Sequence, residues 1–167
     1  MTPSFHDRVR RAARDGSTLL AAAVLAAACG SGGGAQRSVD VATPAGGYGA
    51  DSAERAVIQF LDAAQTENYP GMWAVFGTAE GPAIERFGVQ ETEARMVVLS
   101  RLLKHEDYQL RRADLAGLGA NRTRFEVRMQ GTRKGDVMVP FVTTHDDRGR
   151  WYVEQLQADR LSGAGLN

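Results

Sequence analysis

Between residues 51 and 104, apolar residues recur every three or four positions, which is the spacing of one face of an α-helix. We expect a first helix that is capped by Asp51 or Ser52 and carries Glu54 in its first turn, where a negative charge suits the helix dipole. Its apolar stripe consists of Ala53, Ala56, Val57, Phe60, Leu61 and Ala64. Asp62 lies opposite this stripe, so we expect it to face solvent.

Two further helices are expected after the break at residues 68–71. Pro70 can open a short second helix, because proline is tolerated in a first helical turn. Residues 77–88 are expected to form an irregular connection. Residues 90–104 then form a third helix, in which Val98, Leu99, Leu102 and Leu103 make the apolar face.

After His105 the period of the pattern changes from 3.6 to 2, which is typical of strands. The expected strands are residues 108–114, 122–130, 136–144 and 150–157. The alternation is clearest in the second strand, where Thr123, Phe125, Val127 and Met129 share one face. Pro140 in the third strand indicates an edge or a bulge, because proline has no N–H for a ladder.

Helices first and strands afterwards, with short turns between the strands, predict an α+β domain. We place it at residues 51–160, as amino-terminal helices packed on an antiparallel four-stranded meander. Residues 161–167 are expected to form a frayed tail.

The amino-terminal segment has the pattern of a secretory signal peptide. Arg8, Arg10, Arg11 and Arg14 precede an apolar run at residues 18–28. This run is much shorter than the roughly 20 apolar residues that span a bilayer. We therefore interpret residues 1–28 as a signal and not as an anchor helix.

The run ends in the sequence LAAAC, which resembles the lipobox of bacterial lipoproteins. The resemblance implies that Cys29 becomes the new amino terminus and carries the lipid through a thioether. The position three before the cysteine is Ala26, where the family prefers leucine. The alternative is an ordinary secreted protein with an isolated cysteine. Residues 29–50, rich in Gly, Ala and Ser, are then expected to be the lipidated cysteine and a flexible tether.

Composition excludes several classes of protein. The chain has 20 Lys+Arg and 20 Asp+Glu, so it lacks the basic excess of a nucleic-acid binder. Its one cysteine excludes an intramolecular disulfide framework and a zinc site made of several cysteines. Two histidines remain after residue 28, without paired spacing on one helix, so we expect no metal and no cofactor.

The segment AVIQFLDAAQTENYPGMWAVF, followed much later by GRWYVEQL, resembles the nuclear transport factor 2-like superfamily. The resemblance covers about 110 residues and implies a cystatin-like cone, in which helices pack into a curled antiparallel sheet. The superfamily includes ketosteroid isomerases and polyketide cyclases, but also non-catalytic domains of small bacterial lipoproteins. Isomerase-type members carry an aspartate base on a strand directly after the second helix. Residues 77–88 hold Glu80 and Glu85 but no such motif, so we assign no catalytic residue.

The candidate ligand-binding residues are Arg95, Glu91, Trp73 and Tyr69. Arg95 falls near the centre of the apolar stripe of the third helix, one turn after Glu91, and the two can pair at i, i+4. A guanidinium turned inward has to be paired or bound to an anion, so Arg95 could bind a carboxylate or phosphate of a ligand. The alternative is a structural pair that reaches water. Trp73 and Tyr69 could line a pocket or simply pack in the core.

A polar face on the second strand carries Arg122, Arg124 and Arg128, with Glu126 among them. This face is either a solvated sheet surface or a docking face for an acidic partner or a second copy. Together these observations predict a lipid-anchored protein of the bacterial cell envelope, outside the cytoplasm and, if the cell has two membranes, on the outer membrane facing the periplasm.

The predicted role is a non-catalytic binding or interaction module, as a monomer or homodimer, whose partner is a small molecule or an envelope protein. The alternatives are a pocket enzyme of the isomerase or cyclase type and a structural accessory subunit of an envelope complex.

Overall fold

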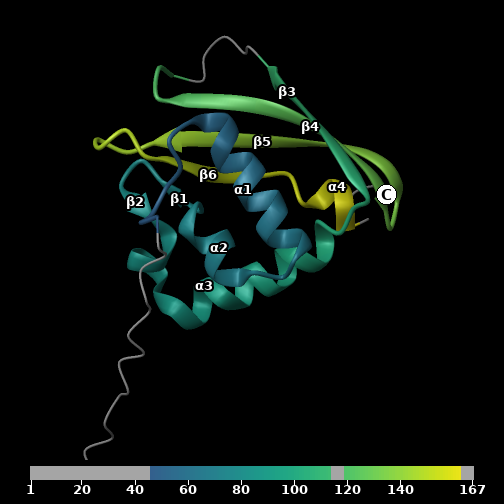
Figure 1. Cartoon of the computed structure of the whole chain (residues 1–167), viewed down its shortest axis with the longest axis horizontal. Coiled ribbons are helices and arrows are strands. Elements are labelled where there is room, and N and C mark those ends of the chain that lie inside the picture. The colour runs from purple at the N-terminus through teal and green to yellow at the C-terminus, as the bar shows by residue number, and fades with distance from the viewer. Residues whose placement is uncertain (1–45, 114–118, 163–167) are drawn as a thin grey trace, which may run out of the picture. The chain divides into compact units, whose positions relative to one another are not determined.

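The computed structural model describes residues 46–113 and 119–162, and these form helices and an antiparallel sheet, as predicted for the α+β class (Figure 1). Cys29 lies outside the described residues, as do the signal and most of the tether. The helices are α1 (Ala53–Gln65), α2 (Tyr69–Ala74), α3 (Ala83–Leu102) and α4 (Asp159–Ser162). The strands are β1 (Gly77–Thr78), β2 (Gly81–Pro82), β3 (Asp107–Ala113), β4 (Arg122–Thr132), β5 (Gly135–His145) and β6 (Trp151–Leu156).

Helix α1 begins where the sequence predicted, because the Ser52 side chain accepts a hydrogen bond from the N–H of Arg55 at 3.2 Å. Its apolar stripe is buried, and Asp62 on the opposite side is exposed. Helix α2 is capped by Asn68, whose Oδ1 accepts from the N–H of Gly71 at 3.0 Å, and it has Pro70 in its first turn. Local sequence therefore accounts for the start of both helices.

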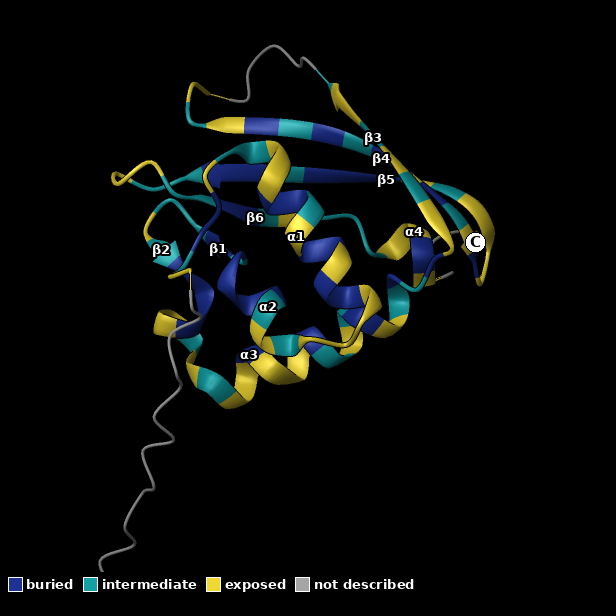
Figure 2. Ribbon diagram, in the orientation of Figure 1, coloured by how far each residue is buried: buried dark blue, intermediate teal, exposed yellow. Residues whose placement is uncertain are grey.

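The main sheet has the strand order β3-β4-β5-β6 and is antiparallel throughout, so it is a meander. On β4 the side chains of Thr123, Phe125, Val127 and Met129 are buried, and the residues between them are not, as the alternation predicted. The buried face of the sheet is turned toward α1, and α2 and α3 lie beyond α1 (Figure 2). The core thus lies between the sheet and the helices.

The expected edge or bulge does not occur at Pro140, because β5 lies between β4 and β6 and its register with β6 shifts only between Val142 and Thr143. Pro140 instead lies level with the end of β6. Its carbonyl oxygen accepts a hydrogen bond from the N–H of Gln157 at 3.1 Å, just beyond the end of β6 at Leu156. The nitrogen of Pro140 faces the same side, where the β5–β6 ladder has already ended. The missing N–H therefore removes no ladder hydrogen bond.

The expectation of an irregular connection at residues 77–88 was wrong in part. Strands β1 and β2 form a small antiparallel pair there, and α3 begins at Ala83, seven positions before the predicted start. Gly88 interrupts α3 with φ 75° and ψ 172°, a conformation that glycine adopts without a steric cost. The sequence pattern thus showed only the part of the helix that follows this interruption.

The expectation of a frayed end after residue 160 was also wrong at its first residues. Helix α4 includes Leu161, which is 7% exposed and belongs to the core. Its N–H donates to the carbonyl of Ala158 at 3.0 Å. A single leucine in a polar segment carries no periodic signal, so its burial depends on the neighbouring sheet and not on the local pattern.

Candidate functional site

The interior between the helices and the sheet is filled by large side chains. Phe60 on α1 is fully buried, stacks on Phe76 with ring centroids 6.0 Å apart, and meets Phe141 of β5 edge-on at 6.5 Å. The other fully buried large side chains include Leu61, Met72, Met96, Leu103, Met129, Val127, Val139 and Val153. Such packing resembles an ordinary domain core.

Arg95 and Glu91 form the predicted ion pair, with Nη2 and Oε1 2.5 Å apart. Arg95 does not turn inward, because 46% of its side chain is exposed, as is 53% of that of Glu91; the pair reaches water, as the structural alternative predicted. The guanidinium of Arg95 instead lies over the ring of Phe87, with its central carbon 4.4 Å from the ring centroid. An exposed pair of this kind contributes little to stability.

The orientation of α3 explains this difference. Its buried residues after the interruption are Thr92, Met96 and Ser100, whereas Val98 is 57% exposed. The hydroxyl of Ser100 donates to the carbonyl of Val97 at 3.0 Å, so a polar side chain can be buried there without an unmet hydrogen bond. A stripe that contains threonine and serine is not visible in a pattern of apolar residues.

Trp73 and Tyr69 lie on α2 and are buried to different degrees. Trp73 is 6% exposed and belongs to the core, and its Nε1 has no hydrogen-bond partner. Tyr69 is half-buried and packs against the same core. Both residues therefore have the packing role that the sequence allowed as the alternative to lining a pocket.

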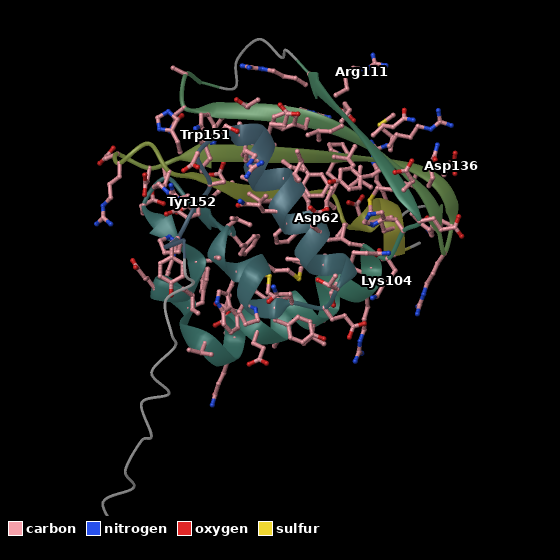
Figure 3. All side chains as sticks on the ribbon, viewed as in Figure 1. Asp62, Lys104, Arg111, Asp136, Trp151 and Tyr152 are labelled. Atoms are coloured by element: carbon pink, nitrogen blue, oxygen red, sulfur yellow. The ribbon has the colours of Figure 1, made fainter. Side chains whose placement is uncertain are left out.

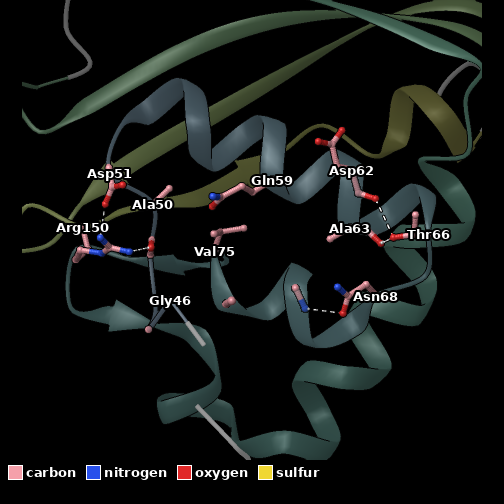
Figure 4. A pocket seen from close by; sticks show the side chains of 14 residues that line it. Gly46, Ala50, Asp51, Gln59, Asp62, Ala63, Thr66, Asn68, Val75 and Arg150 are labelled. Carbon is pink, nitrogen blue, oxygen red and sulfur yellow. Dashed lines mark hydrogen bonds and ion pairs between the residues drawn. The ribbon is translucent and has the colours of Figure 1, made fainter. Parts of the chain in front are cut away.

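A polar groove of about 580 Å³ lies between residues 46–51, α1 and α2 (Figure 4). The polar side chains that line it are those of Asp51, Gln59, Asp62, Thr66, Asn68 and Arg150. Asp62 also accepts a hydrogen bond from the hydroxyl of Tyr108 on β3, with 3.3 Å between the oxygens. The groove is open to solvent, and Ala50, Ala63, Ala74 and Val75 are also among its lining residues, so its lining is mixed.

Arg150 holds one wall of this groove in place. Its Nε donates to the carbonyl of Tyr48 at 3.0 Å, and its two terminal nitrogens bond the carboxylate of Asp51 and the carbonyl of Gly49. Ala50 is also bridged to Trp151 by two backbone hydrogen bonds of 2.8 Å. Residues 48–51 are therefore attached to the beginning of β6. The expectation that the flexible tether extends to residue 50 was wrong for its last residues, because Ala50 is 2% exposed and belongs to the core.

A second hollow, of about 460 Å³, lies between the start of α1 and the buried face of the sheet. Glu54, Arg112, Arg122, Phe125 and Trp151 are among the residues that line it. Arg122 makes two hydrogen bonds of 2.7 Å with the carboxylate of Glu154, and these raise the pKa of the guanidinium. Neither this hollow nor the groove includes Arg95, Glu91, Trp73 or Tyr69 among its lining residues.

Three arginines of β4 on the outer sheet face are paired with carboxylates. Arg122 binds Glu154, Arg124 lies 2.9 Å from Glu126, and Arg128 lies 3.1 Å from Asp136. The charges of these three β4 arginines are therefore balanced by neighbouring carboxylates.

Two tyrosines have strongly shifted acidities. Burial, strengthened by the charge of Asp62, raises the pKa of Tyr108 to about 12. Burial likewise raises the pKa of Tyr152 to about 12, with a further contribution from Asp146, whose Oδ2 accepts from the hydroxyl at 3.3 Å. Both phenols stay protonated at neutral pH, so here they act as hydrogen-bond donors.

Within residues 46–113 and 119–162, no group of three or more His, Cys, Asp and Glu side chains is arranged to hold a metal ion. In the same part of the chain, no helix has the length and apolar character needed to cross a membrane.

Sequence patterns pointed to Arg95 but not to Arg150, which makes more long-range contacts. Arg150 follows the turn at residues 146–149, and a position beside a turn gives no sign of a partner so far away in the chain. Comparison with protein-family models, curated proteins and solved structures finds no match for this chain.

Proposed function

We propose that this protein is a lipid-anchored module of the bacterial cell envelope, which binds a partner and performs no catalysis. In this proposal Cys29 carries the lipid, residues 30–45 connect it to the folded domain, and the domain lies outside the cytoplasm. The support for the anchor is the sequence that ends at Cys29, a basic and then apolar leader followed by small residues.

The single observation that carries the binding role is the filled core. Phe60, Phe141 and Met129 are fully buried between the helices and the sheet, and the rings of Phe60 and Phe141 are in contact. What remains for recognition is the surface of the domain, including its sheet. A partner that docks on this surface fits such a domain better than a substrate that has to enter it.

The finer fold assignment, a cystatin-like cone, is part of the same proposal. It is supported by the way the sheet curls around α1, with Tyr108 of β3 reaching Asp62, and by Phe76, which bridges in parallel to Val153 of β6. The first contact joins the outer strand β3 to α1, and the second joins the segment after α2 to β6; both are compatible with the cone that the resemblance implies.

The anchor is tested with Cys29→Ala in the full chain, expressed in bacteria that are fed a labelled fatty acid. The parent chain should incorporate the label and sediment with membranes, whereas Cys29→Ala should do neither. Ala28→Ser, which keeps a small residue beside the cysteine, serves as the control and should behave like the parent. Equal labelling of the parent chain and Cys29→Ala would contradict the proposal.

The binding role is tested by native mass spectrometry on the full chain, extracted gently from the membrane. We expect the spectrum to show the chain as a monomer, as a self-associated species or in complex with another protein. In each case we expect no bound small molecule. A small molecule of one discrete mass, present in stoichiometric amount, would contradict a filled core and favour the pocket-enzyme alternative.

A further inference from the structure

Strand β3 forms an edge of the main sheet. It pairs with β4 over its whole length, from Asp107 to Ala113, and among the described residues no strand pairs with its other side. Of its seven residues, Asp107, Gln109, Arg111 and Arg112 are exposed. Figure 3 shows Arg111 pointing away from the body of the domain, and it forms no ion pair with another of the described residues. An edge of this length can add a further strand.

The register of the sheet shows which backbone groups of β3 face outward. The carbonyl of Pro140 points toward β6. Glu126 is opposite Pro140 on β4, so its backbone N–H and C=O point the other way, toward β3. On β3 its partner is Arg111, whose backbone groups therefore point toward β4. The backbone N–H and C=O groups of Tyr108 and Leu110, which alternate with Arg111 along the strand, therefore point away from β4. In agreement, the N–H of Tyr108 donates to the side chain of Asp107 at 2.8 Å.

The sequence of this edge is complementary to itself. It reads Asp107-Tyr108-Gln109-Leu110-Arg111, with an acid at one end, a base at the other, and two apolar residues around a central glutamine. When two copies run antiparallel and are centred on Gln109, Asp107 of each copy lies opposite Arg111 of the other. Tyr108 likewise lies opposite Leu110. Directly opposed pairs of both kinds stabilise a sheet.

We propose that two copies of this chain associate through β3, in antiparallel register centred on Gln109, to form one continuous sheet. Tyr108 and Leu110 exchange backbone hydrogen bonds across the two-fold axis. The carbonyl of Leu110 from the second copy replaces the Asp107 carboxylate at the N–H of Tyr108, and that carboxylate pairs with Arg111 of the second copy. This proposal goes beyond the function proposed above and holds whether or not Cys29 carries a lipid.

Other registers lack this complementarity. Centring the pair on Leu110 places Gln109 opposite Arg111 and leaves Asp107 opposite Ala113, without an ion pair. Parallel pairing in register places each Arg111 beside its copy, and like charges directly opposite are destabilising. The charges at the edge thus select one register, and they also disfavour the addition of an unrelated apolar strand.

The first test exchanges the charges. In the full chain carrying Cys29→Ala, which removes any lipid, the dissociation constant of the dimer is measured by sedimentation in a mild detergent. Asp107→Arg and Arg111→Asp should each weaken the dimer on the order of tenfold, because both place like charges opposite each other. The double variant Asp107→Arg/Arg111→Asp should restore it. A chain that is monomeric at all accessible concentrations, or a double variant as weak as the single ones, overturns the proposal.

The second test places a cysteine on the axis. Gln109 faces its own copy as a non-hydrogen-bonded pair, for which the Cα atoms are about 4.5 Å apart, within the range of disulfides. In the Cys29→Ala chain, Gln109→Cys should therefore form a covalent dimer on mild oxidation. Ala113→Cys, four positions along the same strand, lies roughly 25 Å from its copy and is the matched control that should not cross-link. Equal cross-linking of both, or of Gln109→Cys to a different protein, overturns the proposal.

Discussion

The guanidinium of Arg150 donates through Nε to the carbonyl oxygen of Tyr48 at 3.0 Å, and so joins residues that are 102 positions apart in the chain. The same side chain also reaches Asp51 and Gly49. Residues 46–51 lead from the proposed tether into the folded domain. Mechanical force on the proposed anchor would therefore be transmitted to the sheet through this contact.

Replacing Arg150 with alanine should loosen this attachment. Each hydrogen bond to a charged group contributes about 1.5–3 kcal/mol, but Asp51 is exposed, so we expect a total loss of about 1–3 kcal/mol in the free energy of unfolding. Urea denaturation measures this loss, and limited proteolysis should show faster cleavage near residues 46–51. Arg148→Ala, in the adjacent turn, is the matched control and should change neither. Equal effects of the two substitutions would contradict a specific role for Arg150.

Gly49 is held where no side chain fits. Its φ is +75°, and a Cβ there would lie 2.7 Å from Cβ of Arg150 and 2.9 Å from Cζ of Tyr152. Gly49→Ala should therefore destabilise the domain by about 1–3 kcal/mol, through both backbone strain and overpacking. Gly47→Ala separates the two causes, since Gly47 also has a positive φ but open space around it. We expect thermal denaturation to rank Gly49→Ala as the more destabilising, and the reverse order would contradict this account.

The sequence predicted those parts of the fold in which the environment of a residue is set by residues close to it in the chain. The alternation of β4 and the stripe of α1 were confirmed because each element buries one whole face against the core. The cap at Ser52 was confirmed because capping depends only on the next three residues.

The parts that sequence missed depend on contacts between distant segments. Arg95 was placed near the centre of the apolar face of α3, of which Leu103 is indeed buried, but the face that packs also contains Thr92 and Ser100. Leu161 is buried by the sheet and not by its own helix, which has only four residues. For Arg150, the partner residues lie about 100 positions earlier in the sequence. No local pattern contains this information.

Phe60, at the centre of an aromatic cluster, should contribute more to the free energy of unfolding than other single side chains of the core. Phe60 is fully buried between Phe76 and Phe141, so Phe60→Ala removes both ring contacts and leaves a cavity. We expect a loss of about 3–5 kcal/mol in the free energy of unfolding, measured by urea denaturation. Val98→Ala, at an exposed position, is the control and should change stability by less than about 0.5 kcal/mol. A loss for Phe60→Ala as small as that of the control would show that the core is not packed around this ring.

The raised pKa values of Tyr108 and Tyr152 predict how stability changes at alkaline pH. In the unfolded chain a tyrosine loses its proton near pH 10, whereas in the folded domain these two lose theirs near pH 12. Between these values the unfolded chain binds fewer protons than the folded one, so the free energy of unfolding falls as pH rises. The contribution of the two tyrosines is therefore fully present below about pH 10 and is lost between about pH 10 and 12.

The double variant Tyr108→Phe/Tyr152→Phe tests this directly. It should be less stable than the parent at pH 7, because the hydroxyl of Tyr152 no longer bonds Asp146. Its stability should nevertheless decline less steeply between pH 10 and 12, because neither phenylalanine titrates. Urea denaturation at several pH values measures both effects, and ultraviolet absorbance of the folded parent should show two phenols that ionise late. An equally steep decline in the parent and the double variant would mean that other groups, and not these tyrosines, cause the alkaline loss of stability.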